Sequence, residues 1–177
     1  LIACSQDEPV DYPTNPLTAL THSSTAPAPP PMSVDLQTHA ALGIAVAVHI
    51  LLECPQTEQP LPLFDESVYP LGGLALDGSM QGLFDYVLLF AHVLEADAQQ
   101  LVTALVLFES MLRVRPGSLR LRCTRPMLLA TVVVTLKVTL DETLTLSEVT
   151  AQLGNITPAL TPRHLMGLEG ALLTTLG

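Results

Sequence analysis

Apolar residues with helical spacing dominate the chain after Ser79, so the fold is expected to be built mainly of helices. Five segments repeat apolar residues every three or four positions, which is the spacing of one face of an α-helix. Three of these segments follow Ser79, Asp97 and Thr161, which are residue types that cap helix N-termini. Aromatic residues make up only 4% of the chain and tryptophan is absent, so leucine, valine and alanine must fill the core. We therefore expect an all-α bundle of five helices over residues 79–177.

The expected helix boundaries follow from local start and stop signals. The second helix carries apolar residues on two faces, so we expect it to be central and to end at Pro116. The third should begin at Thr124, with Pro126 near its start. Ser147 should cap a short fourth helix at 148–153.

The chain before the bundle has a different composition. Residues 1–34 are rich in proline, serine and threonine, which is typical of an extended linker. Residues 35–53 are apolar enough for a further helix, buried on most sides, and residues 54–78 form a long loop rich in proline and glycine. Loops of that length are usually functional or disordered. We expect three parts: an extension at 1–34, an N-terminal helix and loop at 35–78, and the helical bundle at 79–177.

Residues 131–150 also allow a different fold. TVVVTLKVT at 131–139 is rich in β-branched residues, and TLTLSEVT at 143–150 alternates in polarity. With Asp141 and Glu142 between them, local propensity favours a β-hairpin. The rival to an all-α bundle is therefore an α/β domain that includes this hairpin in a sheet.

Positive charge is confined to one part of the chain. All seven basic residues follow Leu112, whereas thirteen of the seventeen acidic residues precede it, and the net charge is −10. A chain this acidic is not expected to bind nucleic acid or anionic membranes. Four arginines cluster in the sequence: Arg113, Arg115, Arg120 and Arg122. We favour solvated cations that complement a helix dipole, and the alternative is a patch for a phosphate or an acidic protein surface.

The chain shows no clear targeting or membrane-spanning segment. Its apolar stretch at 40–52 has thirteen residues, fewer than the roughly 18 to 20 that span a bilayer, so we expect no membrane insertion. The chain opens with LIACSQDEP, without an initiator methionine or a basic region, so we expect a fragment with no signal peptide. Cys4, Cys54 and Cys123 are expected to be reduced, which is typical of an intracellular protein of the cytoplasm or nucleus.

Few residues are arranged as in catalytic or metal sites. His49 and Glu53 are four positions apart and Cys54 follows, but no second ligand group has matching spacing, so we expect no metal. No nucleophile motif, glycine-rich phosphate loop or carboxylate pair is recognisable. We expect neither a cofactor nor enzyme activity.

The only lysine, Lys137, lies within the apolar run MLLATVVVTLKVTL at 127–140. An unpaired ammonium is so costly to bury that the side chain must either reach water or meet an acid. A single lysine in such a run usually packs its aliphatic side chain against apolar neighbours and keeps its ammonium group in water. Glu169, between Gly167 and Gly170, is by the same reasoning a solvated polar position.

Three stretches, in order, resemble a cyclin box. LVTALVLFESMLRV at 101–114 resembles the central helix of the box, and PMLLATVVVTLKVTLDE at 126–142 resembles the next helix, with Lys137 at the signature lysine. TPRHLMGLEGALLTTLG at 161–177 resembles the fifth helix, with Glu169 at the family's glutamate. The FES-type central helix is most similar to that of single-box cyclins, such as the cyclin Y-like group.

The resemblance implies a five-helix bundle that binds a cyclin-dependent protein kinase. In such bundles the lysine and the glutamate lie side by side and hydrogen-bond main-chain groups near the αC helix of the kinase, which holds that helix in its active position. The resemblance thus implies a regulatory subunit that binds and activates, or directs, the kinase and supplies no reacting group. The residues implied at the interface are Lys137, Glu169, Val138, Leu140, Leu165 and Leu172, the last four as its apolar core.

The sequence departs from the cyclin pattern at three places, of which one is Val87, where relatives place a tryptophan. Gln81 replaces an arginine that in cell-cycle cyclins pairs with an acid at the position of Glu109, so only a hydrogen bond could join them. Thr139 stands where single-box relatives tend to have Trp or Asp. The alternative function is a cyclin-fold adaptor that binds other proteins without a kinase partner. A second alternative, based on a mean hydropathy of +0.45, is a small helical protein that rests on membranes.

Overall fold

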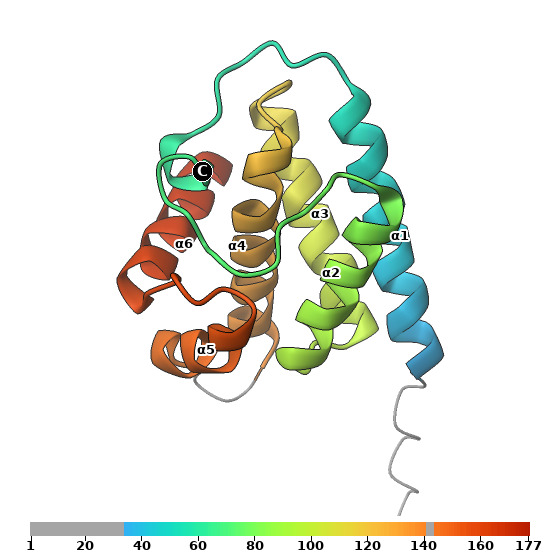
Figure 1. Ribbon diagram of the computed structural model, residues 1–177, viewed down its shortest axis with the longest axis vertical. Coiled ribbons are helices and arrows are strands. Elements are labelled where there is room, and N and C mark those ends of the chain that lie inside the picture. Colours follow the sequence, from blue (N-terminus) through green and yellow to red (C-terminus); the bar gives the residue numbers. More distant parts are fainter. Residues whose placement is uncertain (1–33, 141–143) are drawn as a thin grey trace, which may run out of the picture. The chain divides into compact units, whose positions relative to one another are not determined.

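The computed structural model describes residues 34–140 and 144–177, and all regular structure in these two ranges is helical (Figure 1). Six α-helices and two short 3-10 turns make up this part of the chain. They are α1 (Val34–Glu53), α2 (Met80–Val93), α3 (Ala98–Val114), α4 (Leu121–Thr139), α5 (Leu146–Gln152) and α6 (Pro162–Leu176), with η2 at Pro62–Phe64 and η3 at Leu153–Asn155. The all-α prediction is confirmed. The expected linker lies almost wholly outside the described residues.

The alternative prediction of a hairpin at 131–150 is wrong. Thr131–Thr139 continues α4, and the chain is helical again from Leu146. Every residue of α4 from Cys123 to Leu136 is buried. Contacts with neighbours on all sides therefore decide the conformation here, and they outweigh the weak preference of β-branched residues for strands.

Side-chain caps start most of these helices where the sequence predicts. Ser79 caps α2, Asp97 caps α3 and Thr161 caps α6, and each accepts a hydrogen bond from the main-chain N–H three residues later. The predicted cap of the fourth helix is wrong. Thr145, and not Ser147, caps α5, because it forms a reciprocal capping box with the glutamate three residues later.

α4 begins at Leu121, before the predicted start at Thr124, and Pro126 lies inside it. Proline has no N–H, so the carbonyl of Arg122, four residues earlier, lacks its usual helical donor. The N–H of Glu66 supplies that hydrogen bond instead, at 3.2 Å. Pro126 therefore marks a place where α4 binds the long loop, and this contact cannot be inferred from the local sequence.

The central helix of the described fold is α4. Its buried stretch packs against α3, α6 and η2 (Figure 1). The prediction that the second helix, α3, is central is wrong, because α3 leaves Val102 and Val106 exposed. A helix with two apolar faces need not bury both, since apolar atoms supply much of any protein surface.

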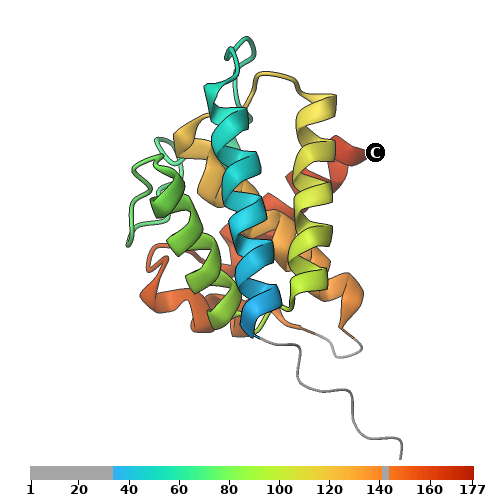
Figure 2. The ribbon, with the colours of Figure 1, turned by 90° about the vertical axis from the view of Figure 1, so that its right-hand side faces the viewer.

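α1 packs against α2 and α3 with one face only (Figure 2). Ile44 and Val48 on its inner side are buried, whereas Val46 and Ile50 on its outer side are exposed. The prediction of a helix buried on most sides is therefore wrong. By length and composition alone, Leu36–Glu53 meets the requirement for a membrane span, but its inner face belongs to the protein core.

Four arginines hold the long loop at residues 54–78 against the helices. The most buried is Arg125, with 4% of its side chain exposed. It donates to the carbonyls of Gly72 (2.6 Å) and Leu74. Its Nε atom lies 3.3 Å from Glu66 Oε1. The guanidinium thus exchanges water for three oxygen partners, which is the condition for burying a charge.

The other three arginines bind the loop nearer the surface. Arg122 Nε lies 3.0 Å from Asp65 Oδ2. Arg115 pairs with Glu58 (3.5 Å), and Arg120 donates to the carbonyl of the same residue (3.1 Å). The preferred interpretation of these arginines as solvated cations is therefore incomplete: Arg122 keeps 54% of its side chain exposed, yet all three also bind the loop.

The helix-dipole interpretation fits Arg113 alone within the arginine cluster. This side chain is exposed in the last turn of α3 and lies 3.6 Å from Glu109, one turn earlier. The uneven distribution of charge in the sequence thus has a structural role. Arginines that follow Leu112 pair with carboxylates of the loop, so opposite charges from distant parts of the chain meet.

Ile44→Ala is expected to destabilise the protein by about 2–5 kcal/mol, because it leaves a cavity in the core beneath α1. Ile50→Ala is the matched control: the same change at an exposed position of the same helix should alter the free energy of unfolding by less than about 0.5 kcal/mol. Urea denaturation followed by circular dichroism measures both values. Equal losses would show that α1 does not pack as described.

Arg125→Met should lower the free energy of unfolding by about 3 kcal/mol or more, because the Glu66 carboxylate loses its cation and two loop carbonyls lose their donor. Arg113→Met removes an exposed guanidinium and should cost less than about 1 kcal/mol. Chemical denaturation of both variants and of the parent protein measures these changes in the free energy of unfolding. A parent-like stability of Arg125→Met would contradict the role of this side chain in holding the loop.

Candidate functional site at Lys137 and Glu169

Lys137 lies in the last turn of α4 and directly follows the buried stretch, so it stands where the central helix leaves the core. The N–H of Leu140 closes the helix by donating to the carbonyl of Leu136 (2.9 Å). A cation in this turn is stabilised by the negative end of the helix dipole. The position thus favours a charged side chain although the preceding residues are apolar.

Glu169 lies on α6, which packs along α4 (Figure 1). Leu165, Leu168 and Leu172 form the buried stripe of this helix. Glu169 directly follows one member of the stripe, which places its carboxylate at the edge of the core. An acid at such an edge is partly removed from water and requires a cation or a donor nearby.

The two side chains meet in a bidentate ion pair. Lys137 Nζ lies 2.7 Å from Glu169 Oε1 and 2.9 Å from Oε2. The lysine side chain is 30% exposed and the glutamate side chain 12% exposed. The ammonium therefore meets an acid, and the pair keeps enough exposure for another molecule to reach it. Residues 32 positions apart are brought side by side, as the resemblance to cyclins implies.

The predicted apolar neighbours of the pair divide into two groups. Val138 is 79% exposed and Leu140 is exposed as well, so both are open to a partner. Leu165 and Leu172 have 0% exposure, and the prediction that they contact a partner is wrong. They belong to the stripe of α6 that faces the core, because residues three or four positions apart lie on one side of a helix.

Sequence reasoning missed Met166 and Leu173, two exposed apolar residues of α6. They stand three positions before and four positions after Glu169, which puts all three side chains on one side of the helix. That spacing could have identified them. Together with two residues of α4 they form what we call the pair surface: Lys137, Val138, Met166, Glu169 and Leu173.

A polar contact fixes the end of α4 next to the pair surface. The amide of Gln100 donates to the hydroxyl of Thr139 (3.0 Å), which itself donates to the carbonyl of Thr135 (2.9 Å). Gln100 is buried, and its side-chain oxygen accepts from the N–H of Asp97 (2.9 Å). The pair surface is therefore built on a fixed helix end and needs little reordering to bind another molecule.

The hydrogen bond considered between Gln81 and Glu109 is not formed. Gln81 donates to Asp85, one turn later on α2 (2.7 Å), and Glu109 pairs with Arg113. The start of α2 therefore lacks the contact with α3 that a likeness to cell-cycle cyclins would imply.

Within residues 34–140 and 144–177, no three His, Cys, Asp or Glu side chains gather as they would around a metal ion. His49 Nε2 lies 3.7 Å from Glu53 Oε1, and the glutamate is largely exposed. This contact is an ordinary pair on one face of α1.

The pair surface combines charge with exposed apolar atoms and is suited to binding another molecule.

The two cysteines in the described residues, Cys54 and Cys123, are free thiols, and Cys4 lies outside those residues. Burial raises the pKa of Cys123 to about 11. Its thiol therefore stays protonated near neutral pH and is a poor nucleophile.

Comparison with known proteins gives no match. No protein-family model matches the chain, no curated protein matches it, and no solved structure matches it. These comparisons therefore identify no family for the chain.

Removal of one member of the ion pair should destabilise the protein more than removal of both. Lys137→Met leaves the largely covered carboxylate of Glu169 without its cation, and we expect a loss of about 2 kcal/mol in the free energy of unfolding. Lys137→Met combined with Glu169→Leu leaves no unpaired charge, so the double variant should lose less than Lys137→Met alone. Chemical denaturation measures these differences. Strictly additive losses would mean that the two residues do not stabilise each other.

Proposed function

We propose that this chain is a cyclin-like regulatory subunit that binds and activates, or directs, a cyclin-dependent protein kinase. The observation that carries the proposal is the ion pair between Lys137 on α4 and Glu169 on α6. The cyclin-like stretches place these residues at the kinase-contacting lysine and glutamate of the family. The resemblance selected Lys137 and Glu169 from the sequence alone, and the two side chains are in contact although they belong to different helices. A resemblance that arose by chance would give no reason to expect this contact.

The geometry of the pair suits the recognition of main-chain groups. An ammonium has three donors, and a carboxylate has two acceptor oxygens. Because Lys137 and Glu169 hold each other, little side-chain freedom is lost when a partner binds. The pair can therefore present donors and acceptors to the backbone of a kinase without a large entropic cost.

Exposed apolar residues around the pair would supply the rest of the interface. Val138, Met166 and Leu173 are the apolar members of the pair surface. Contact residues that combine apolar area with a few fixed polar groups are typical of the centre of a protein interface. Val138 stays a predicted apolar contact, and Met166 and Leu173 replace the buried Leu165 and Leu172.

In the proposed mechanism the chain supplies contacts and no reacting group. A subunit that binds the active arrangement of the kinase αC helix more tightly than the inactive one shifts the population towards the active form. The lysine and glutamate of the kinase that position ATP are then held together. This proposal implies a site of action in the cytoplasm or nucleus. The absence of nucleic-acid binding and membrane insertion remains a prediction.

An exchange of the two charges tests the proposal without leaving either charge unpaired. Lys137→Glu combined with Glu169→Lys should leave the chain folded, because one ion pair is replaced by another, with a loss of about 0.3–1 kcal/mol from placing an acid at the negative end of the α4 dipole. Donors and acceptors are exchanged, however, so binding to the kinase should weaken at least about tenfold, or 1.4 kcal/mol. Partners are captured with the parent chain from cells that express it, and the affinity of any recovered kinase is then measured by calorimetry.

Arg113→Glu is the control, since it reverses an exposed charge away from the pair surface and should leave the affinity unchanged. Recovery of no kinase, or equal affinity of the exchanged variant, would contradict the proposal. Recovery of other proteins that the exchanged variant no longer binds would support the alternative of a cyclin-fold adaptor. The rate of substrate phosphorylation with and without the chain distinguishes activation from docking alone.

A further inference from the structure

A second surface of the protein carries a pocket of about 450 Å³, between the long loop and the start of α6. Leu63, Tyr69 and Pro70 line it from the loop, and Ala159, Arg163 and His164 line it from the other side. The volume lies within the range of about 300–1,000 Å³ that is usual for ligand pockets. The lining is mainly apolar, with one cation at its edge.

The walls of the pocket are fixed by contacts within the protein. The N–H of Ala159 donates to the carbonyl of Leu71 (3.0 Å) and joins the two sides. Gly73, with φ +70°, passes so close to Ile156 that a Cβ atom there would lie 2.0 Å from the Ile156 carbonyl oxygen. No other residue type fits that approach. The pocket is therefore formed before anything binds, and little ordering is required of it.

Two rings form one part of the wall. The centroids of Tyr69 and His164 are 5.3 Å apart, with the ring planes tilted by 41°. Burial lowers the pKa of His164, so its imidazole is neutral near pH 7 and adds no charge beside Arg163. This side of the pocket thus presents aromatic surface to a bound group.

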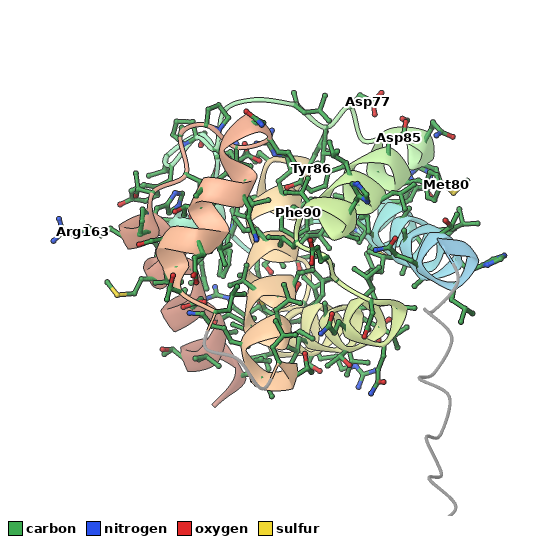
Figure 3. All side chains as sticks on the ribbon, turned by 90° about the horizontal axis from the view of Figure 1, so that it is seen from below. Asp77, Met80, Asp85, Tyr86, Phe90 and Arg163 are labelled. Atoms are coloured by element: carbon green, nitrogen blue, oxygen red, sulfur yellow. The ribbon has the colours of Figure 1, made fainter. Side chains whose placement is uncertain are left out.

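Arg163 differs from every other basic residue in the described part of the chain. The other six each contact a carboxylate or another hydrogen-bond acceptor in the fold, whereas Arg163 has no such partner among residues 34–140 and 144–177. It lies in the first turn of α6, where the helix dipole disfavours a cation. Figure 3 shows its side chain pointing away from the helices into solvent. Its guanidinium is therefore free to pair with an anion from another molecule at the edge of the pocket.

We propose that this pocket is a docking site for a partner protein, which binds through a short segment with an aspartate or glutamate next to a bulky apolar residue. The apolar side chain enters the pocket against Leu63, Tyr69 and Pro70. The carboxylate pairs with Arg163, whose planar guanidinium suits a two-oxygen acceptor.

Charge complementarity selects this occupant over other anions. One guanidinium matches the single charge of a carboxylate, whereas protein sites for phosphate groups usually gather several cations. The net charge of −10 repels the many phosphates of nucleic acid far more strongly than the single carboxylate of a short segment. An acidic residue can pair with Arg163 while its apolar neighbour fills the pocket.

The docking site is distinct from the Lys137–Glu169 ion pair, although Met166 of the pair surface lies only one turn after Arg163 on α6. Arg163 precedes Glu169 by six positions on α6, which is roughly 9 Å along the helix axis and on a different side of it. The proposal does not depend on a kinase partner, and each can fail without the other.

The test uses the full chain, labelled with ¹⁵N, and the capped peptide acetyl-Gly-Glu-Phe-Gly-amide as the probe. Titration followed by NMR should give saturable shifts at Tyr69, Ala159 and His164, with a dissociation constant in the millimolar range. The peptide with glutamine in place of glutamate should bind about fivefold more weakly, as should the Arg163→Gln variant, which corresponds to about 1 kcal/mol.

Two further variants make the result specific to this pocket. Ala159→Leu keeps the N–H that joins the walls but fills part of the cavity from an exposed position, so it should abolish the saturable shifts. Arg113→Gln removes an exposed arginine elsewhere and should leave binding unchanged. Circular dichroism verifies that each variant is folded. Shifts without saturation, equal binding of both peptides, or equal binding by Arg163→Gln would each overturn the proposal.

Discussion

The buried guanidinium of Arg125 is the interaction on which most of the described structure depends. It joins the first half of the central helix to two carbonyls and one carboxylate of the loop at 54–78. Because a buried cation is tolerated only when its donors find partners, the loop has to follow one path. On that path the main-chain N–H of Glu66 reaches α4 and donates to the carbonyl of Arg122, to which Pro126 cannot donate. The same path brings Tyr69 to the start of α6, where it forms a wall of the apolar pocket.

Both candidate binding surfaces belong to α6, and this arrangement has a physical basis. The helix is anchored by its buried leucine stripe, so its outer side chains keep fixed positions. Near its start, Arg163 and the pocket can receive an acidic segment, while further along Glu169 meets Lys137. A subunit that binds two segments of one partner at once gains affinity through effective concentration. The spacing of the two surfaces on one rigid helix would set the length of the connection between those segments.

The sequence predicts the features that depend on neighbouring residues, and it fails where distant residues decide. Asp97 and the residues after it specify the start of α3 locally, so that prediction is correct. The start of α4 is predicted wrongly, since the role of Pro126 depends on Glu66 in the loop. Leu172 is apolar and lies three positions after Glu169, so the sequence alone allows it to face a partner. Only the packing of α6 shows that it faces the core. Lys137 and Glu169 could be paired in advance only through a resemblance, because 32 positions separate them.

The separation of charges along the chain also affects how the protein is made. Residues 1–112 contain no lysine or arginine, so during synthesis the loop acids Glu58, Asp65 and Glu66 leave the ribosome before the arginines that bind them. The arginines that bind the loop follow their partners by 51 to 64 positions. The loop therefore cannot take its final path until the start of α4, with Arg122 and Arg125, has been translated.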